Sequence, residues 1–183
     1  NTLSFMPTSP QLSQLLPAWE VVARLGAAVL VGGIIGLNRE IRHKSAGLRT
    51  QALVSLGSAT ATLVVSELAA VGDTFDTSAV SRVMQGVLTG IGFLGAGVIL
   101  HDRQDGQIQG LTTAASIWVS CTLGLACGVG FWHLALAVMG LALAVLLGGI
   151  RIEQAVHRRW GVPPEVAKGN GPGSGSGPGT GPN

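Results

Sequence analysis

The longest uncharged stretch of the sequence runs from Gly106 to Ile150 and contains 45 residues without Asp, Glu, Lys or Arg. Because a helix rises about 1.5 Å per residue, the apolar part of this stretch would be about 60 Å long as a single helix. The hydrocarbon core of a bilayer is only about 30 Å thick. The stretch therefore predicts two spanning helices, at 111–130 and 132–150, separated by a break within Gly128–His133.

Three further apolar runs are long enough to cross a bilayer: Val21–Leu37, Thr50–Val71 and Val83–Leu100. In the whole chain 47% of the residues are hydrophobic and only 11% are charged, whereas a soluble domain carries about 25% charged residues. The predicted fold class is therefore all-α, a polytopic membrane helix bundle with about five transmembrane helices in contact with the lipid bilayer. The basic residues lie at the ends of apolar runs rather than in one stripe, which argues against nucleic-acid binding.

The distribution of Lys and Arg predicts the orientation of the helices, because cytoplasmic loops are enriched in basic residues. One side carries nine of the eleven basic residues, namely Arg39, Arg42, Lys44, Arg49, Arg103, Arg151, Arg158, Arg159 and Lys168. The other side carries only Arg24 and Arg82. We therefore expect the N-terminus to lie outside, together with Asp73 and Asp76, and the C-terminus to lie in the cytoplasm.

The chain divides by composition into an N-terminal tail (1–19), a transmembrane domain (20–151), a cytoplasmic juxtamembrane segment (152–168) and a C-terminal tail (169–183). In the C-terminal tail every odd position from Gly169 to Gly181 is glycine, so this tail is expected to be disordered. The two cysteines, Cys121 and Cys127, are about 240° apart around a helix. They are expected to be buried thiols rather than a disulfide or a metal pair.

The third apolar run is rich in glycine, with Gly86, Gly90, Gly92, Gly95 and Gly97. It matches the G-x-G-x-x-G string of dinucleotide-binding loops, but that motif requires a preceding strand and a βαβ unit. On a helix, Gly86, Gly90 and Gly97 share one face, whereas Gly92 and Gly95 lie nearly opposite. Small residues let membrane helices approach closely, so we expect both faces to pack and this helix to be central. The alternative is a permeation path lined by backbone groups.

Several polar residues at the helix ends are candidates for interaction. Glu67 is the acidic residue inside an apolar run, which makes it a functional candidate unless it simply reaches the outer interface. Arg49 and Thr50 open the second helix, where Arg49 is a candidate for a lipid phosphate, a partner carboxylate or no specific ligand. Thr112 and Thr113 are expected to cap the fourth helix.

Enzymatic activity is not expected. The sequence shows no metal-ligand spacing, no nucleophile beside a base motif and no phosphate-binding loop in a soluble context. Glu40 and Lys44 are expected to form a weak i, i+4 surface pair. We therefore expect neither a bound metal nor a cofactor.

Several short motifs, taken together in this order, carry a family resemblance. They are Gly36-Leu37-Asn38-Arg39-Glu40, Ala46-Gly47-Leu48-Arg49-Thr50, Leu53–Gly57, Arg82, Gly90–Gly97, Gly110–Ala115 and Trp118–Gly130. In these motifs the chain resembles the MgtC/SapB family of bacterial inner-membrane proteins, as a short SapB-like member without the soluble C-terminal domain of longer members. It departs from the family at Asn38, where Glu is common, and at Gln85, where the usual Gln comes one position later.

The resemblance implies a multi-pass protein of the bacterial inner membrane that is associated with growth under magnesium limitation and with survival inside macrophages. It also implies a regulator that acts on another membrane protein, including the membrane sector of the ATP synthase. We therefore expect a non-enzymatic regulator, with a Mg²⁺ transporter or channel as the alternative. Protein sites for Mg²⁺ usually use one or two carboxylates, and Glu67 alone among nine acidic residues lies within an apolar run. The oligomeric state stays open.

Overall fold

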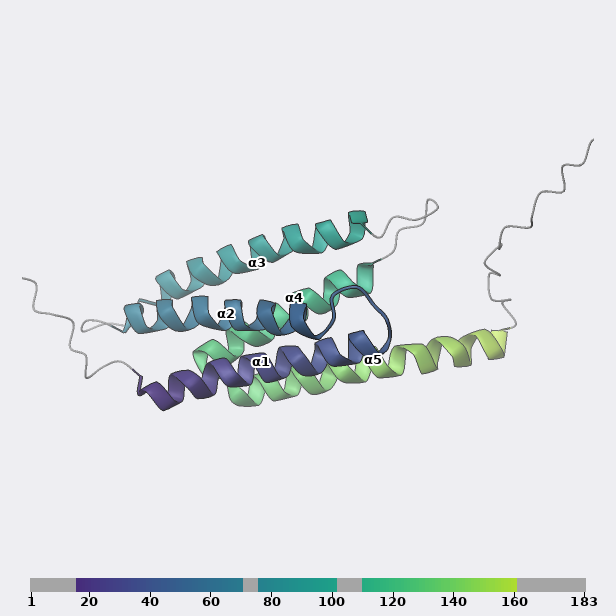
Figure 1. Ribbon diagram of the computed structural model, residues 1–183, viewed down its shortest axis with the longest axis horizontal. Coiled ribbons are helices and arrows are strands. Elements are labelled where there is room, and N and C mark those ends of the chain that lie inside the picture. The colour runs from purple at the N-terminus through teal and green to yellow at the C-terminus, as the bar shows by residue number, and fades with distance from the viewer. Residues whose placement is uncertain (1–15, 71–75, 102–109, 161–183) are drawn as a thin grey trace, which may run out of the picture. The chain divides into compact units, whose positions relative to one another are not determined.

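The computed structural model describes residues 16–70, 76–101 and 110–160, and over these residues the chain is helical without strands. The helices are α1 (Ala18–Ile41), α2 (Leu48–Ala69), α3 (Thr77–His101), α4 (Leu111–Val129) and α5 (Trp132–Trp160) (Figure 1). The predicted all-α class is therefore confirmed. The C-terminal tail at 169–183, most of the N-terminal tail and Asp73 lie outside the described residues.

Four of the helices are long and apolar enough to cross a membrane: α1, α2, α3 up to Ile99, and α4. The apolar part of α5, Trp132–Gly148, is shorter and falls at the lower limit of about 17 residues for a spanning helix. The helix itself continues to Trp160, beyond the end expected at Ile150 and into the expected juxtamembrane segment. A membrane helix bundle is thus confirmed, whereas the side on which each end lies stays a prediction.

The break between α4 and α5 falls where the glycines predicted it. The amide of Phe131 donates to the carbonyl of Ala126 at 2.9 Å, and the amide of Gly130 donates to that of Cys127 at 3.0 Å. Gly130 adopts φ 89°, a left-handed conformation that glycine reaches without a Cβ penalty. This pair of bonds is a Schellman motif, which ends a helix by satisfying its last carbonyls.

The end of α1 has the same motif without glycine. The amide of Lys44 donates to the carbonyl of Arg39 at 3.1 Å, and the amide of His43 donates to that of Glu40 at 3.0 Å. His43 takes the left-handed position with φ 51°. Because a Cβ is unfavourable in that conformation, this turn stores a modest backbone strain.

Helices α2 and α4 form the centre of the bundle, since they pack against each other and each also packs against α1 and α3 (Figure 1). Glycines allow the closest approaches. A Cβ built at Gly32 of α1 would lie 2.6 Å from the Gln51 carbonyl oxygen, and one at Gly36 would lie 2.6 Å from Leu48 Cα. A Cβ at Gly128 of α4 would lie 2.6 Å from the carbonyl oxygen of Ala59. These approaches leave no room for a side chain at the glycine positions.

The expectation that the third helix is central is wrong for the packing within this chain. A Cβ added at Gly86, Gly90, Gly92 or Gly97 would meet nothing within 4 Å, and only Gly95 has a neighbour, Ala114 Cβ at 3.5 Å. Instead, α3 packs through larger side chains, Val87, Leu88, Ile91 and Val98, against a cluster that includes Ile117 and Cys121 of α4. The glycine face of α3 lies about 120° around the helix from this packed face.

The chain separates into two compact units, residues 1–145 and residues 146–183. The described part of the first unit contains α1 to α4 and the start of α5. That of the second is the remainder of α5, up to Trp160. The sites below all belong to the first unit.

Candidate functional site

A line of buried polar side chains runs between α2 and α4, and we call it the polar seam. Its α2 members are spaced i, i+4, i+7 and i+11, and its α4 members i, i+3 and i+7, so each set lies on one helix face. The members are Gln51, Ser55, Ser58, Thr62, Thr113, Ser116 and Ser120, all of them buried. This seam was not predicted from the sequence, although the helical spacing of its hydroxyl residues was a visible signal for it.

Hydrogen bonds connect the two sides of the seam. Gln51 Nε2 donates to Ser116 Oγ at 2.8 Å, and Ser116 Oγ donates to the Thr113 carbonyl at 2.7 Å. Further along, Ser58 Oγ donates to the Val54 carbonyl at 2.8 Å and lies 3.2 Å from Cys121 Sγ. Such interhelical bonds between small polar residues help membrane helices to associate.

The seam is closed rather than hollow. A Cβ added at Gly124 of α4 would fall within 3.0 Å of the backbone of Ser55, and one at Gly128 would fall equally close to Ala59. Backbones in direct contact leave no width for a file of water molecules or for an ion. The polar seam therefore holds α2 and α4 together and does not form an open path at these levels.

Arg39 lies at one end of the seam, which we call the Arg39 end. The side chain is 3% exposed, and its Nη2 donates to Thr113 Oγ1. Ser45 Oγ lies 3.5 Å from the same Thr113 oxygen. Two buried donors here, Arg39 Nε and Asn38 Nδ2, have no hydrogen-bond partner. The structure thus brings the motif residue Arg39 together with Thr113 from a motif far along the chain.

The expectation that Thr112 and Thr113 cap α4 is wrong. The residue before the helix is Gly110, with φ 83°, and no side chain makes a cap hydrogen bond there. Thr112 is exposed, and Thr113 is buried against Arg39. The hydroxyl of Thr113 serves a contact between helices that sequence spacing could not show, because its partner is 74 residues away.

Glu40 acts differently from the expected i, i+4 pair with Lys44. Its Oε2 accepts a hydrogen bond of 2.8 Å from the amide of Leu48, the first residue of α2. A carboxylate at the N-terminus of a helix satisfies a free amide and interacts favourably with the helix dipole. Two other candidates, Arg49 and Thr50, have exposed side chains in the first turn of α2.

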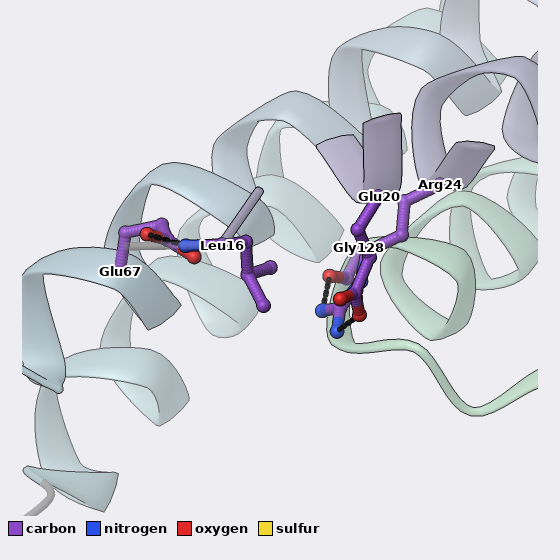
Figure 2. A network of polar contacts seen from close by, with 5 residues as sticks. All are labelled: Leu16, Glu20, Arg24, Glu67 and Gly128. Atoms are coloured by element: carbon purple, nitrogen blue, oxygen red, sulfur yellow. Dashed lines mark hydrogen bonds and ion pairs between the residues drawn. The ribbon is translucent and has the colours of Figure 1, made fainter. Parts of the chain in front are cut away.

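At the other end of the bundle, which we call the Arg24 end, the side chain of Arg24 links α1 to α4 (Figure 2). From the sequence, Arg24 was interpreted only as an indicator of topology. Arg24 Nη2 lies 2.5 Å from Glu20 Oε1, and Arg24 Nη1 donates to the carbonyl of Gly128 at 2.9 Å. The i, i+4 spacing of Glu20 and Arg24 was a visible signal for the first contact. The second depends on tertiary structure, because α1 and α4 are distant in the sequence.

Glu67 also lies at the Arg24 end, where its Oε2 accepts a hydrogen bond of 3.0 Å from the amide of Leu16, just before α1 (Figure 2). This hydrogen bond has a structural role, because it joins α2 to the segment that precedes α1. Arg82 is exposed on α3, where its Nη2 donates to Ser78 Oγ at 3.1 Å and lies 4.0 Å from Asp76 Oδ2. Glu67 and Arg82 are thus placed on separate elements from Arg39 and Thr113.

Asp76 caps the N-terminus of α3. Its Oδ1 accepts hydrogen bonds from the hydroxyl of Ser78 at 2.6 Å, the amide of Ser78 at 2.9 Å and the amide of Ala79 at 3.2 Å. The Ser78 hydroxyl is the main reason that the pKa of Asp76 lies below its ordinary value. Within residues 16–70, 76–101 and 110–160, no group of three or more His, Cys, Asp and Glu side chains is arranged to hold a metal ion.

Apolar spanning helices, close glycine contacts and an internal polar seam define a multi-pass α-helical membrane protein. Residues 25–155 match the MgtC family. The chain therefore belongs to the MgtC family, in agreement with the motifs described above. No solved structure matches the chain significantly.

Three relatives illustrate the similarity. Protein SrpB of Synechococcus elongatus is 41% identical over 142 residues, which cover 74% of this chain and 78% of SrpB. Protein MgtC of Brucella abortus is 43% identical over 114 residues, covering 62% of this chain and 44% of that protein. Protein MgtC of Salmonella typhimurium is 37% identical over 137 residues, covering 75% and 54% respectively. The matched region thus spans about half the length of these two MgtC proteins.

Proposed function

We propose that this protein is a non-enzymatic regulator of the bacterial inner membrane that acts by binding another membrane protein. Family resemblance favours the membrane sector of the ATP synthase as the partner. It also favours magnesium limitation as the condition under which the protein acts. The observation that carries the proposal is the open glycine face of α3, formed by Gly86, Gly90 and Gly97.

The glycine face has the properties of a helix-docking surface. Among the residues that the structure describes, no atom lies within 4 Å of a Cβ built at these three positions. Phe93 lies beside the glycines and is 82% exposed. In membranes, small residues allow two helix backbones to come close, and the van der Waals packing between them is the main attraction between apolar helices. The close approaches in the described part of the chain lie elsewhere, on α1 and α4, and the described helices leave this face open to a partner helix.

The packing within the bundle supports a regulator over the alternative, a Mg²⁺ transporter or channel. The buried polar groups that a path would need lie in the polar seam, where backbone contacts at Gly124 and Gly128 exclude a chain of waters. Glu67, the carboxylate within an apolar run, accepts a hydrogen bond from a backbone amide at one end of the bundle. Since Mg²⁺ sites usually combine carboxylates with retained waters, these features favour binding over transport.

Partner capture tests the proposal. Native membranes would be cross-linked, the tagged protein would be purified, and its partners would be compared between the wild type, Gly90→Leu and a control, Gly57→Leu. Gly57 is also open, with nothing within 4 Å of a Cβ, but it lies on α2. We expect both variants to accumulate as folded protein and only Gly90→Leu to lose the partner. Equal recovery of partners by all three proteins would show that the glycine face meets only lipid.

A transport assay tests the alternative directly. The purified protein would be reconstituted into vesicles that contain a Mg²⁺-sensitive dye, and protein-free vesicles would serve as the baseline. We expect no uptake above the baseline. Uptake that is lost on Glu67→Gln would instead favour the transporter.

A further inference from the structure

The N-terminus of α4 presents a positive electrostatic field without a capping group. The helix has 19 residues, and the residue before it, Gly110, makes no side-chain cap hydrogen bond. The first amides of a helix have no partner within the helix. Together with the helix dipole, they make this end equivalent to about half a positive charge. The first turn of α4 is therefore an environment that favours an anion.

The structure places a second positive charge on this same turn. Arg39 donates to the hydroxyl of Thr113, in the first turn of α4, and only 3% of its surface is exposed. Its Nε is buried and has no hydrogen-bond partner. A buried charge beside a like-signed helix end is costly unless an opposite charge accompanies it. The arrangement thus points to an anion that completes it.

The described part of the chain does not provide this anion. Among residues 16–70, 76–101 and 110–160, the ion pairs are Arg24 with Glu20 and Arg82 with Asp76, both away from the Arg39 end. The nearest carboxylate along α1, that of Glu40, accepts the amide of Leu48 instead. Asn38 Nδ2 adds a further buried donor without a partner. The buried guanidinium of Arg39 therefore has no counter-ion among these described residues.

We propose that Arg39 and the N-terminal turn of α4 bind a phosphate group. A guanidinium matches the geometry of phosphate oxygens, and free amides at a helix N-terminus bind phosphate in many proteins. The hydroxyls of Ser45 and Thr112 are exposed beside this turn and supply further donors on the side of approach. This proposal concerns a ligand of the bundle itself and does not depend on the partner face of α3.

The position of the site suits a membrane phosphate. Arg39 lies near the end of α1 at Ile41, Leu48 begins α2 and Leu111 begins α4, so three helices leave the apolar layer here. Headgroup phosphates of lipids lie at this level of a bilayer. The chemistry is shared by the phosphate of an anionic phospholipid and by free inorganic phosphate, and the experiment separates these sources.

Thermal unfolding of the full chain in detergent tests the site. The probes are inorganic phosphate, phosphatidylglycerol added to the micelles, and sodium chloride at the same ionic strength. A ligand that binds only the folded state stabilises it by RT ln(1 + [L]/Kd), so the melting temperature rises with the ligand concentration. We expect a rise with phosphatidylglycerol beyond that with chloride. A rise with inorganic phosphate as well would identify free phosphate as a second source.

Variants test whether Arg39 and the first turn of α4 cause the rise in melting temperature with phosphate. Arg39→Gln should abolish it, whereas Arg49→Gln, which removes an exposed arginine at the same end, should preserve it. Because Arg39→Gln can also impair folding, Thr112→Asp gives a second reading by placing a carboxylate at the exposed first turn of α4. Thr112→Asp should raise the basal melting temperature and remove the phosphate response. Thr50→Asp, at the corresponding turn of α2, should leave the phosphate response in place.

Three outcomes would overturn the proposal. The first is a wild-type melting temperature that responds to both phosphate probes no more than to chloride. The second is an equal response to acetate, which would assign the site to a carboxylate of a protein partner. The third is a phosphate response that appears only after Asp102 and Asp105 are replaced by Asn, because the chain itself would then supply the anion.

Discussion

Arg24 Nη1 donates a hydrogen bond of 2.9 Å to the backbone carbonyl of Gly128, which joins α1 to α4 across 104 positions of the sequence. The carbonyl belongs to the last turn of α4, where carbonyls have no partner within the helix. A cation at this end also interacts favourably with the helix dipole. Glu20 contacts the same guanidinium, which keeps it oriented toward Gly128.

Replacement of Arg24 should therefore destabilise the bundle. We expect Arg24→Gln to lower the free energy of unfolding by about 1–3 kcal/mol, since a hydrogen bond to a charged group and a favourable dipole contact are lost together. Denaturant titration of the purified protein in detergent would measure the change. Arg82→Gln, at an exposed arginine of α3, is the control and should have little effect. Equal effects of the two variants would contradict the role of Arg24.

Close backbone contact at Gly124 predicts a second destabilising change. Gly124→Ala places a methyl group against the backbone of Ser55, so the two central helices must separate. Overpacking of this kind costs about 1–3 kcal/mol. Gly86→Ala is the control, because its Cβ meets nothing within 4 Å and alanine favours a helix by up to about 1 kcal/mol. Melting temperatures that fall for Gly86→Ala and not for Gly124→Ala would reverse the assignment of the packed faces.

The left-handed conformation of His43 predicts a stabilising change. We expect His43→Gly to raise the free energy of unfolding by up to about 1 kcal/mol, because relief of strain of about 1–2 kcal/mol exceeds the added chain entropy of glycine. Gly130→Ala is the converse change and should destabilise, since its φ is 89° and a Cβ would lie 3.0 Å from Arg24 Cζ. Thermal unfolding of both variants checks these two expectations. A loss of stability in His43→Gly would show that the left-handed conformation of His43 is not strained.

The cap of α3 predicts a dependence on pH. The pKa of Asp76 is lowered in the folded protein, mainly by the hydroxyl of Ser78 and then by the amide of Ala79. Its contribution is therefore present above the ordinary aspartate pKa and is lost as the pH falls through the folded value. Asp76→Asn retains a capping oxygen but cannot titrate, so its melting temperature should fall less on acidification below about pH 4. Parallel acid profiles would contradict a charged cap.

Orientation in the membrane is tested by labelling. In a variant without Cys121 and Cys127, a single cysteine would be introduced within 128–133 or at Asp105. An impermeant thiol reagent applied to intact cells should label the first position and not the second, because the basic residues predict that Asp105 faces the cytoplasm. Labelling at Asp105 from outside would reverse the predicted topology.

Much of the fold could be predicted because its causes are local. The length of each apolar run sets how many helices can span a bilayer, and Gly130 marks the turn between α4 and α5 because glycine tolerates φ 89° there. The motif residues Asn38, Arg39 and Thr113 were named as candidates, and the structure brings Arg39 into contact with Thr113. Their relationship was not predictable, because helical periodicity describes one helix at a time.

By itself, the sequence determined that this chain forms apolar helices broken at particular turns, because apolarity, helix length and turn chemistry depend on residues close together in the chain. Tertiary structure decided which glycines are packed. Gly90 and Gly124 are identical residues in apolar helices, yet the first meets nothing and the second touches the backbone of Ser55. It likewise decided that Arg24 binds Gly128 and that Arg39 adjoins the start of α4. The reason is physical: packing depends on which helix faces approach each other, and in lipid that choice arises from contacts between residues far apart in the sequence.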